Sequence, residues 1–180
     1  MKNKDSLKSI IVLVAICIAI GAAMAGVNML TKDTIAEVQA EKEAKALNEV
    51  VEKNGGFEKL TLTGELPESV VAVYRDKDGE GFAILLAAKG YDSSNPISIA
   101  VGIKNDGTIE KCSVISCTGE TSGIGTKVST EGFLSQFDGK SDVEDVDTIS
   151  GATISSSAFR SAVNDAFSVF SLLSESEELK

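Results

Sequence analysis

The residues best suited to chemistry lie in the segment 147–155, Asp-Thr-Ile-Ser-Gly-Ala-Thr-Ile-Ser, which leads into a predicted helix. Gly151 and Ala152 leave the backbone nearly bare, so a bulky group can approach it closely. Thr153 offers a hydroxyl at this point, with a serine on either side. Because a helix N-terminus presents free N–H groups and a partial positive charge, the segment predicts a phosphate site. The alternative is an ordinary helix start, with Thr153 or Ser155 as the N-cap.

A second candidate segment, 120–125, reads Glu-Thr-Ser-Gly-Ile-Gly and lies a short distance before the first. Two glycines with a threonine hydroxyl suit a tight loop packed against a flat ring. Taken alone, the segment is more typical of a surface turn.

Composition excludes several classes of function. The chain has 180 residues, a net charge of −10 and no histidine. So acidic a surface disfavours nucleic acid, whose binding depends on cationic side chains. Without histidine the chain lacks the usual haem ligand, the commonest zinc ligand and the default general base. Any redox chemistry is therefore expected to come from an organic cofactor.

The three cysteines do not predict a redox or metal site. Cys17 lies in an apolar run, and Cys112 and Cys117 are too few for a four-thiolate cluster. If Cys112 and Cys117 share a strand, their odd spacing places them on opposite faces, too far apart for a disulfide. We interpret both as small buried apolar residues.

The N-terminal region predicts a membrane anchor. The segment 10–30 carries no charge, and a helix of that length spans about 30 Å, the thickness of a bilayer's hydrocarbon core. Three lysines, Lys2, Lys4 and Lys8, precede it, so the positive-inside rule places the N-terminus in the cytoplasm and the rest outside. The alternative is a cleaved signal peptide, since Ala23-Met24-Ala25 resembles a cleavage site.

The rest of the chain predicts an α+β domain, a small antiparallel sheet packed with helices. Period-two apolar patterns and turn residues indicate about four strands, at 69–74, 82–88, 97–103 and 108–115. Helical periodicity indicates helices at 31–54, at 129–137 with Ser129 as its cap, and at 155–174. The expected organisation is a cytoplasmic end (1–9), a transmembrane helix (10–30), a stalk or packing helix (31–56), an outer domain (57–174) and a tail (175–180).

The segment 147–155 resembles the flavinylation motif of the FMN-binding domain family. The resemblance covers every specified position of that motif: Asp147, Ser150, Gly151, Ala152, Thr153 and Ser155. It implies that a flavin transferase moves FMN from FAD onto the Thr153 hydroxyl, with Mg²⁺ and release of AMP. It also implies that the other five residues serve recognition or surround the phosphate. A tether of this kind would prevent loss of the flavin outside the cell.

The segment 120–125 resembles the family's Glu-Thr-Pro-Gly-Leu-Gly loop, which lies beside the flavin. The resemblance adds four candidate FMN contacts: Glu120, Thr121, Gly123 and Gly125. Residues 133–140 resemble the short helix and turn that follow. Two departures are Ser122 in place of the proline and Gly119 where many members have a larger polar residue.

The resemblance implies an electron-carrier subunit with covalent FMN and no separate catalytic activity. The chain length favours the G subunit of Rnf complexes over the C subunit of the sodium-pumping NADH:quinone oxidoreductase. An Rnf complex implies ferredoxin:NAD electron transfer coupled to Na⁺ or H⁺ transport, with other subunits as partners. The alternatives are a flavin carrier of another respiratory system and an anchored structural module without flavin.

Overall fold

The computed structural model describes residues 2–51, 55–62, 66–79 and 81–175. The chain divides into two compact units, Met1–Glu41 and Lys42–Lys180. Each is described by itself.

The first unit consists of the first part of a single long helix, α1, whose full range is Lys2–Val50. The large apolar side chains between Ile10 and Leu30 are each at least 50% exposed. Among the described residues, α1 is the one helix long and apolar enough to cross a membrane. The predicted span 10–30 therefore lies inside a continuous helix. No other part of this unit that the structure describes packs over its apolar side chains.

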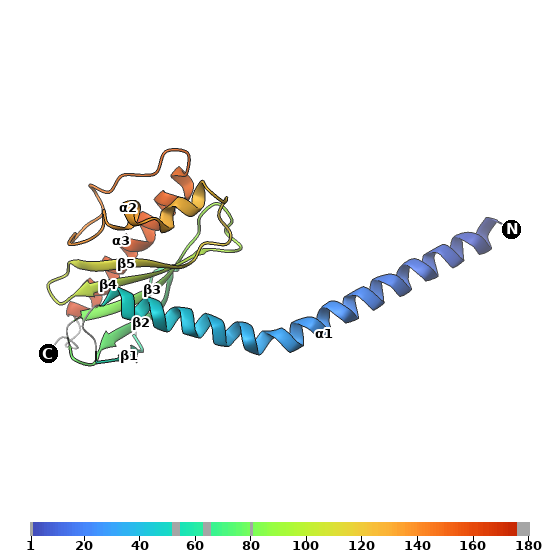
Figure 1. Ribbon diagram of the computed structural model, residues 1–180, viewed down its shortest axis with the longest axis horizontal. Coiled ribbons are helices and arrows are strands. Elements are labelled where there is room, and N and C mark those ends of the chain that lie inside the picture. Colours follow the sequence, from blue (N-terminus) through green and yellow to red (C-terminus); the bar gives the residue numbers. More distant parts are fainter. Residues whose placement is uncertain (1, 52–54, 63–65, 80, 176–180) are drawn as a thin grey trace. The chain divides into compact units, whose positions relative to one another are not determined.

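The second unit is built on a five-stranded antiparallel sheet in the order β1-β2-β3-β4-β5 (Figure 1). Each strand pairs with the next along the chain, so the sheet is a simple meander. The strands are β1 (Phe57–Leu60), β2 (Val70–Asp76), β3 (Gly81–Ala88), β4 (Ile97–Lys104) and β5 (Ile109–Ser116).

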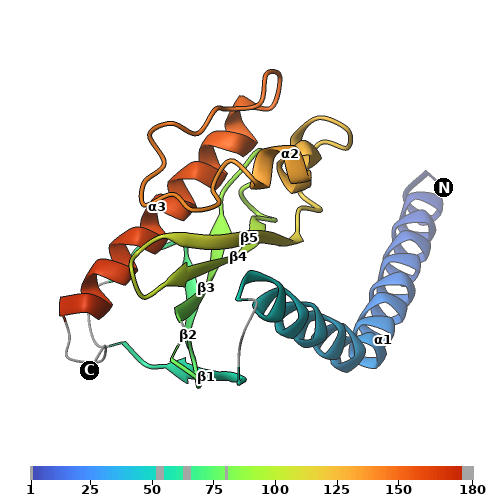
Figure 2. The same ribbon diagram turned by 60° about the vertical axis from the view of Figure 1, so that its left-hand side comes forward.

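Three helical elements follow the sheet: η1 (Gly125–Ser129), α2 (Glu131–Leu134) and α3 (Thr153–Glu175). Figures 1 and 2 show α3 along one face of the sheet, with the segment that contains α2 next to it. Three phenylalanines, Phe133, Phe137 and Phe159, meet there with ring centroids 5.3–5.4 Å apart. These rings join α2 and the turn after it to α3.

The sheet is buried on both faces because its central strands alternate between two cores. On β3, Phe82, Ile84 and Leu86 belong to the core that contains α3. Ala83 and Leu85 belong to a second core, which contains the end of α1 and Val51, the residue that follows it. A strand buried on both faces reads as a continuous apolar run, which explains the sequence of β3.

The predicted α+β class is confirmed, and the four predicted strands correspond to β2–β5. Strand β1 was not predicted, because Phe-Glu-Lys-Leu is too short and too polar to stand out. The apolar residues that recur at helical spacing in the predicted helix 155–174 form a stripe that packs in the core: Phe159, Val163 and Leu173 are fully buried, and Phe167 and Phe170 are partly buried.

Some predicted boundaries were wrong. The second predicted helix does not begin with Ser129 as cap: Ser129 ends η1, and α2 follows Thr130 as a single turn without a side-chain cap. The helix predicted over 31–54 is part of α1, which ends at Val50, and positions 52–54 lie outside the described residues. Most of the predicted tail (175–180) also lies outside the described residues.

Cys112 and Cys117 are free thiols. Cys112 lies in β5 and is fully buried in the core with α3, whereas Cys117 follows the strand and is partly buried against the same core. Burial raises the pKa of the Cys112 thiol far above its ordinary value, and the Asp138 carboxylate adds to this shift. The thiol therefore stays protonated and behaves as a small apolar side chain.

Candidate functional site

Thr153 is the first residue of α3, and a tight turn delivers the chain to it. The Ala152 N–H donates to the Ile149 carbonyl at 2.9 Å, which closes a turn over Ser150 and Gly151. Gly151 has a φ of 82°, a left-handed conformation that glycine adopts at little cost. The local sequence Ile-Ser-Gly-Ala thus sets the direction in which the helix starts.

The first turn of α3 leaves its N–H groups available. The first helical hydrogen bond runs from the Ser156 N–H to the Ala152 carbonyl, at 3.0 Å. The N–H groups of residues 153–155 precede it and lack partners within the helix. The Thr153 side chain is exposed, and its hydroxyl has no hydrogen-bond partner among the described residues. An exposed hydroxyl therefore lies at the positive end of a helix dipole.

The N-cap alternative does not describe this helix start, because neither Thr153 nor Ser155 caps it. Thr153 lies inside the helix. The hydroxyl of Ser155 donates to Glu120 Oε2 instead of to a backbone group of the helix. The turn is secured by Ser156, which sequence reasoning missed: its buried hydroxyl accepts from the Ile149 N–H at 3.1 Å and donates to the Ala152 carbonyl at 2.9 Å.

Glu120 joins three segments that are far apart in the sequence. Its side chain is buried, with 7% exposure. Oε1 accepts from the Tyr91 N–H at 2.9 Å, and Oε2 accepts from the Ser155 hydroxyl. We call this arrangement the Glu120 clasp. It ties the loop after β3 and the loop after β5 to the first turn of α3.

The clasp depends on two glycines that make room for the carboxylate. A Cβ on Gly90 would overlap Glu120 Oε1. A Cβ on Gly125 would lie 2.6 Å from Oε2 and 2.9 Å from the Ser155 hydroxyl oxygen. Gly125, predicted to contact a flavin, therefore also has a packing role against Glu120.

A pocket of about 380 Å³ opens beside Thr153. It contains six predicted site residues: Thr121, Gly125, Gly151, Ala152, Thr153 and Ser155. Three further lining residues were not predicted: Tyr91, Ile124 and Ile154, which are 68%, 47% and 60% exposed. Their signal in the sequence was weak, since single apolar residues in loops (Tyr91 and Ile124) or on the exposed side of a helix start (Ile154) do not extend a periodic apolar pattern.

The other four predicted residues do not line this pocket. Glu120 lies buried beneath it in the clasp. Ser150 is exposed in the turn before α3, and Asp147 is exposed with its N–H bonded to the Gln136 side chain at 2.9 Å. Gly123 lies in the loop after β5, where its N–H donates to the Thr126 hydroxyl at 2.9 Å.

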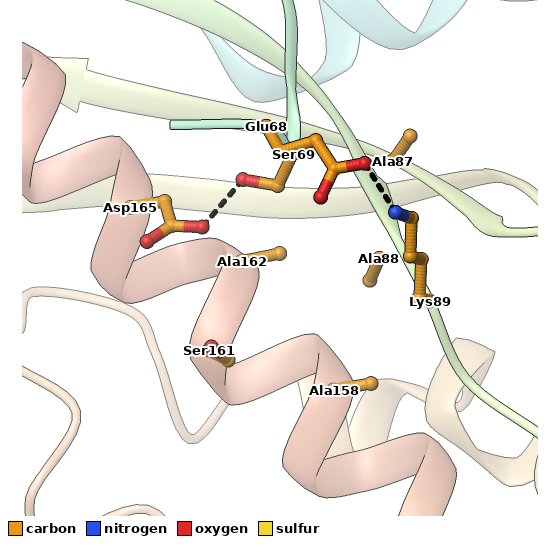
Figure 3. A pocket seen from close by; sticks show the side chains of 9 residues that line it. All are labelled: Glu68, Ser69, Ala87, Ala88, Lys89, Ala158, Ser161, Ala162 and Asp165. Carbon is orange, nitrogen blue, oxygen red and sulfur yellow. Dashed lines mark hydrogen bonds and ion pairs between the residues drawn. The ribbon is translucent and has the colours of Figure 1, made fainter. Parts of the chain in front are cut away.

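A second pocket, of about 220 Å³, lies between α3, the residues that lead into β2 and the end of β3 (Figure 3). Its polar groups already pair with each other: Ser69 donates to Asp165 Oδ2 at 2.5 Å, and Lys89 pairs with Glu68. Alanines form much of the remaining wall. No group of three or more potential metal ligands occurs within the part of the chain that the structure covers. The pocket beside Thr153 is therefore the stronger candidate.

Comparison with known proteins agrees with this choice. Residues 90–168 match the family model described as FMN-binding domain, and residues 1–50 match that of the RnfG N-terminal region. The first match contains the whole pocket beside Thr153.

Two curated relatives align along nearly the full chain. One is the G subunit of the Na(+)-translocating ferredoxin:NAD(+) oxidoreductase complex of Acetobacterium woodii, 29% identical over 92% of this chain and 91% of that protein. The other is the G subunit of the ion-translocating oxidoreductase complex of Methanosarcina acetivorans, 28% identical over 91% of this chain and 94% of that protein.

Proposed function

We propose that the protein is an electron-transfer subunit with FMN esterified to Thr153. Two similarities support this assignment. Residues 90–168 belong to the FMN-binding domain family, and the whole chain resembles G subunits of Rnf-type complexes. The observation that carries the proposal is the Thr153 hydroxyl, exposed at the start of α3 and inside a pocket of the matched region.

The residues around this pocket fit FMN. Its volume of about 380 Å³ lies within the roughly 300–1,000 Å³ of small-molecule sites. Free N–H groups at the helix start suit a phosphate. Tyr91, Ile124 and Ile154 give apolar surface for a flat ring, within reach of the same hydroxyl. The pocket thus offers a polar end for the phosphate and an apolar part for the isoalloxazine.

Attachment requires that Thr153 act as a nucleophile toward FAD. A bond forms between Thr153 Oγ1 and the phosphorus of the FMN half, the pyrophosphate bond breaks, AMP leaves, and the hydroxyl proton passes to a base of the transferase. The chain has to present an accessible hydroxyl and bare backbone, which Gly151 and Ala152 provide. Once bound, the flavin supplies the electron-transfer chemistry, and the protein supplies position and surroundings.

Thr121 is a second exposed hydroxyl in the same pocket, but two features favour Thr153. Thr153 stands at a helix N-terminus, where a phosphate is stabilised by the dipole, whereas Thr121 lies in a loop. The Thr121 carbonyl accepts from the N–H groups of Ile124 and Thr126 at 3.1 and 3.3 Å, so this residue already organises its own loop.

The proposed setting is a membrane complex. The apolar segment 10–30 anchors the chain, the N-terminus lies in the cytoplasm, and the FMN-binding domain of 57–174 faces the other side. The other subunits of an Rnf-type complex exchange electrons with the flavin, and the complex couples ferredoxin:NAD electron transfer to transport of Na⁺ or H⁺.

The attachment is tested by the intact mass of the full-length protein produced together with its flavin transferase. Wild-type protein should gain one FMN less one water, and should show flavin fluorescence in a denaturing gel. Thr153→Ala should lose both signals, whereas the matched variant Thr121→Ala should keep them. Wild-type protein without added mass, or a Thr153→Ala variant with it, contradicts the proposal.

A further inference from the structure

Tyr91 is the one aromatic side chain that lines the pocket beside Thr153 within the described residues, and it is largely exposed. Exposed apolar surface is ordinary when it is scattered. Here, however, Tyr91, Ile124 and Ile154 come from three separate segments and surround the same pocket as the Thr153 hydroxyl. Such a cluster indicates a ligand or partner that covers it.

The backbone of Tyr91 is held in place on both sides. Its N–H donates to Glu120, which also binds Ser155 in the first turn of α3. After it, the Asp92 side chain accepts from the Ser94 N–H at 2.9 Å and from the Asn95 side chain at 2.7 Å. The tyrosine is thus fixed relative to the helix that carries Thr153, although its ring is exposed.

The tether determines what can cover this ring. A flavin bound through its phosphate to Thr153 keeps its isoalloxazine within one ribityl chain of that residue, and Tyr91 and Thr153 line one pocket. Oxidised isoalloxazine is planar, apolar over most of its area and poor in electrons. An electron-rich phenol is a favourable stacking partner for such a ring.

We propose that the ring of Tyr91 packs against the isoalloxazine of the flavin on Thr153, with Ile124 and Ile154 as its apolar neighbours. The inference rests on the proposed function and deepens it, because it assigns the ring-binding part of the site. Tyr91 is a positioning residue that favours the oxidised flavin, since the reduced ring is bent and richer in electrons and stacks less well. Loss of Tyr91 should therefore raise the reduction potential of the flavin.

Flavin fluorescence gives a direct test. An excited flavin takes an electron from a phenol in contact with it, and the electron returns without emission, so a packed tyrosine quenches the flavin. The chain has two tyrosines and no tryptophan. Tyr74, the other tyrosine, packs against the second core, which contains the end of α1 and excludes α3. It is therefore a matched control.

The measurement uses native, full-length, flavin-loaded protein, with emission expressed per FMN found by intact mass. Tyr91→Leu should raise the emission several-fold and shift the reduction potential upward, whereas Tyr74→Leu should change neither. Tyr91→Phe keeps the ring and loses the phenol, so it should also raise the emission; it serves as the second variant if Tyr91→Leu loads poorly.

Unchanged emission in Tyr91→Leu and Tyr91→Phe at normal loading overturns the inference and leaves the proposed function intact. An equal rise in Tyr74→Leu also overturns it. Wild-type protein that gains no FMN mass contradicts the proposed function, and the inference falls with it.

Discussion

At the scale of single residues, the site depends on which hydroxyls form hydrogen bonds within the protein. The Ser155 hydroxyl donates a hydrogen bond to Glu120, and the Ser156 hydroxyl secures the turn before α3. Thr153 lies beside them on the same helix turn and is exposed, without a partner among the described residues. Three neighbouring hydroxyls of similar chemistry therefore have different roles. Ser155 and Ser156 use their hydroxyls in hydrogen bonds within the protein, whereas Thr153 is the candidate nucleophile.

Cys112 shows the same influence of surroundings on a reactive group, and it predicts a dependence of stability on pH. In the unfolded chain its thiol ionises near a pKa of about 8.5, whereas in the folded protein burial raises the pKa and keeps the proton on. Above that pH the unfolded state binds fewer protons. The free energy of unfolding should therefore fall, by at most about 1.4 kcal/mol per pH unit.

Below the pKa of the unfolded thiol, both states hold the proton, and Cys112 adds no pH dependence. Chemical unfolding of the wild type and of Cys112→Ala, compared between about pH 8 and about pH 10, isolates this contribution. The wild type should lose more stability over this interval than the variant. Equal losses would show that the Cys112 thiol ionises in the folded protein.

At the scale of elements, the Glu120 clasp positions the site. Antiparallel pairing builds the meander from neighbours in the sequence, but it does not hold the loops after β3 and β5 against α3. One buried carboxylate does this, with room made by Gly90 and Gly125. When the carboxylate is lost, the loop that carries Tyr91 is therefore expected to move independently of the start of α3.

Glu120→Ala should lower stability and flavin loading together. It leaves the buried Ser155 hydroxyl without its acceptor, at a cost of about 1–3 kcal/mol for the unsatisfied group, and it also removes the acceptor of the part-buried Tyr91 N–H. The thermal unfolding midpoint and the FMN mass of full-length protein measure the two effects. Glu144→Ala, which removes an exposed carboxylate of the loop before α3, should change neither. A Glu120→Ala variant with wild-type stability would show that the clasp contributes little.

At the scale of the whole molecule, the cations that flank the apolar segment bear on its orientation in the membrane. Lys2, Lys4 and Lys8 precede the apolar segment, and Lys32 is the first cation after it. This asymmetry of lysines agrees with the proposed cytoplasmic N-terminus and with the proposed flavin domain on the opposite side. The proposed phosphoester link to FMN would suit a location where a dissociated cofactor is not recovered.

Orientation is tested with alkaline phosphatase fused after Lys180, because this reporter needs disulfides that form outside the cytoplasm. The fusion should be active. Replacing Lys2, Lys4 and Lys8 by Gln leaves Lys32 as the dominant flanking cation and should lower the activity several-fold at equal protein level. An inactive wild-type fusion that is present in the membrane would contradict the proposed topology.

Local patterns in the sequence were sufficient for the α+β class, the strands β2–β5, the apolar span and the buried stripe of α3. These features follow from the apolar period and from turn residues, both of which act over a few positions. Short β1 was missed for the same reason, since its four residues carry too little pattern. The segment 147–155 stood out because glycine, alanine and hydroxyl residues meet there at a helix start.

What only the tertiary structure decided was which distant groups share the site. Sequence could propose Glu120 and Ser155 as neighbours of a flavin, but their mutual hydrogen bond exists only once the loop after β5 lies on α3. Tyr91 likewise enters the pocket through a backbone contact with a residue far along the chain. Local propensities act within a turn or a strand, whereas the partners of a buried carboxylate are set by packing of the whole domain.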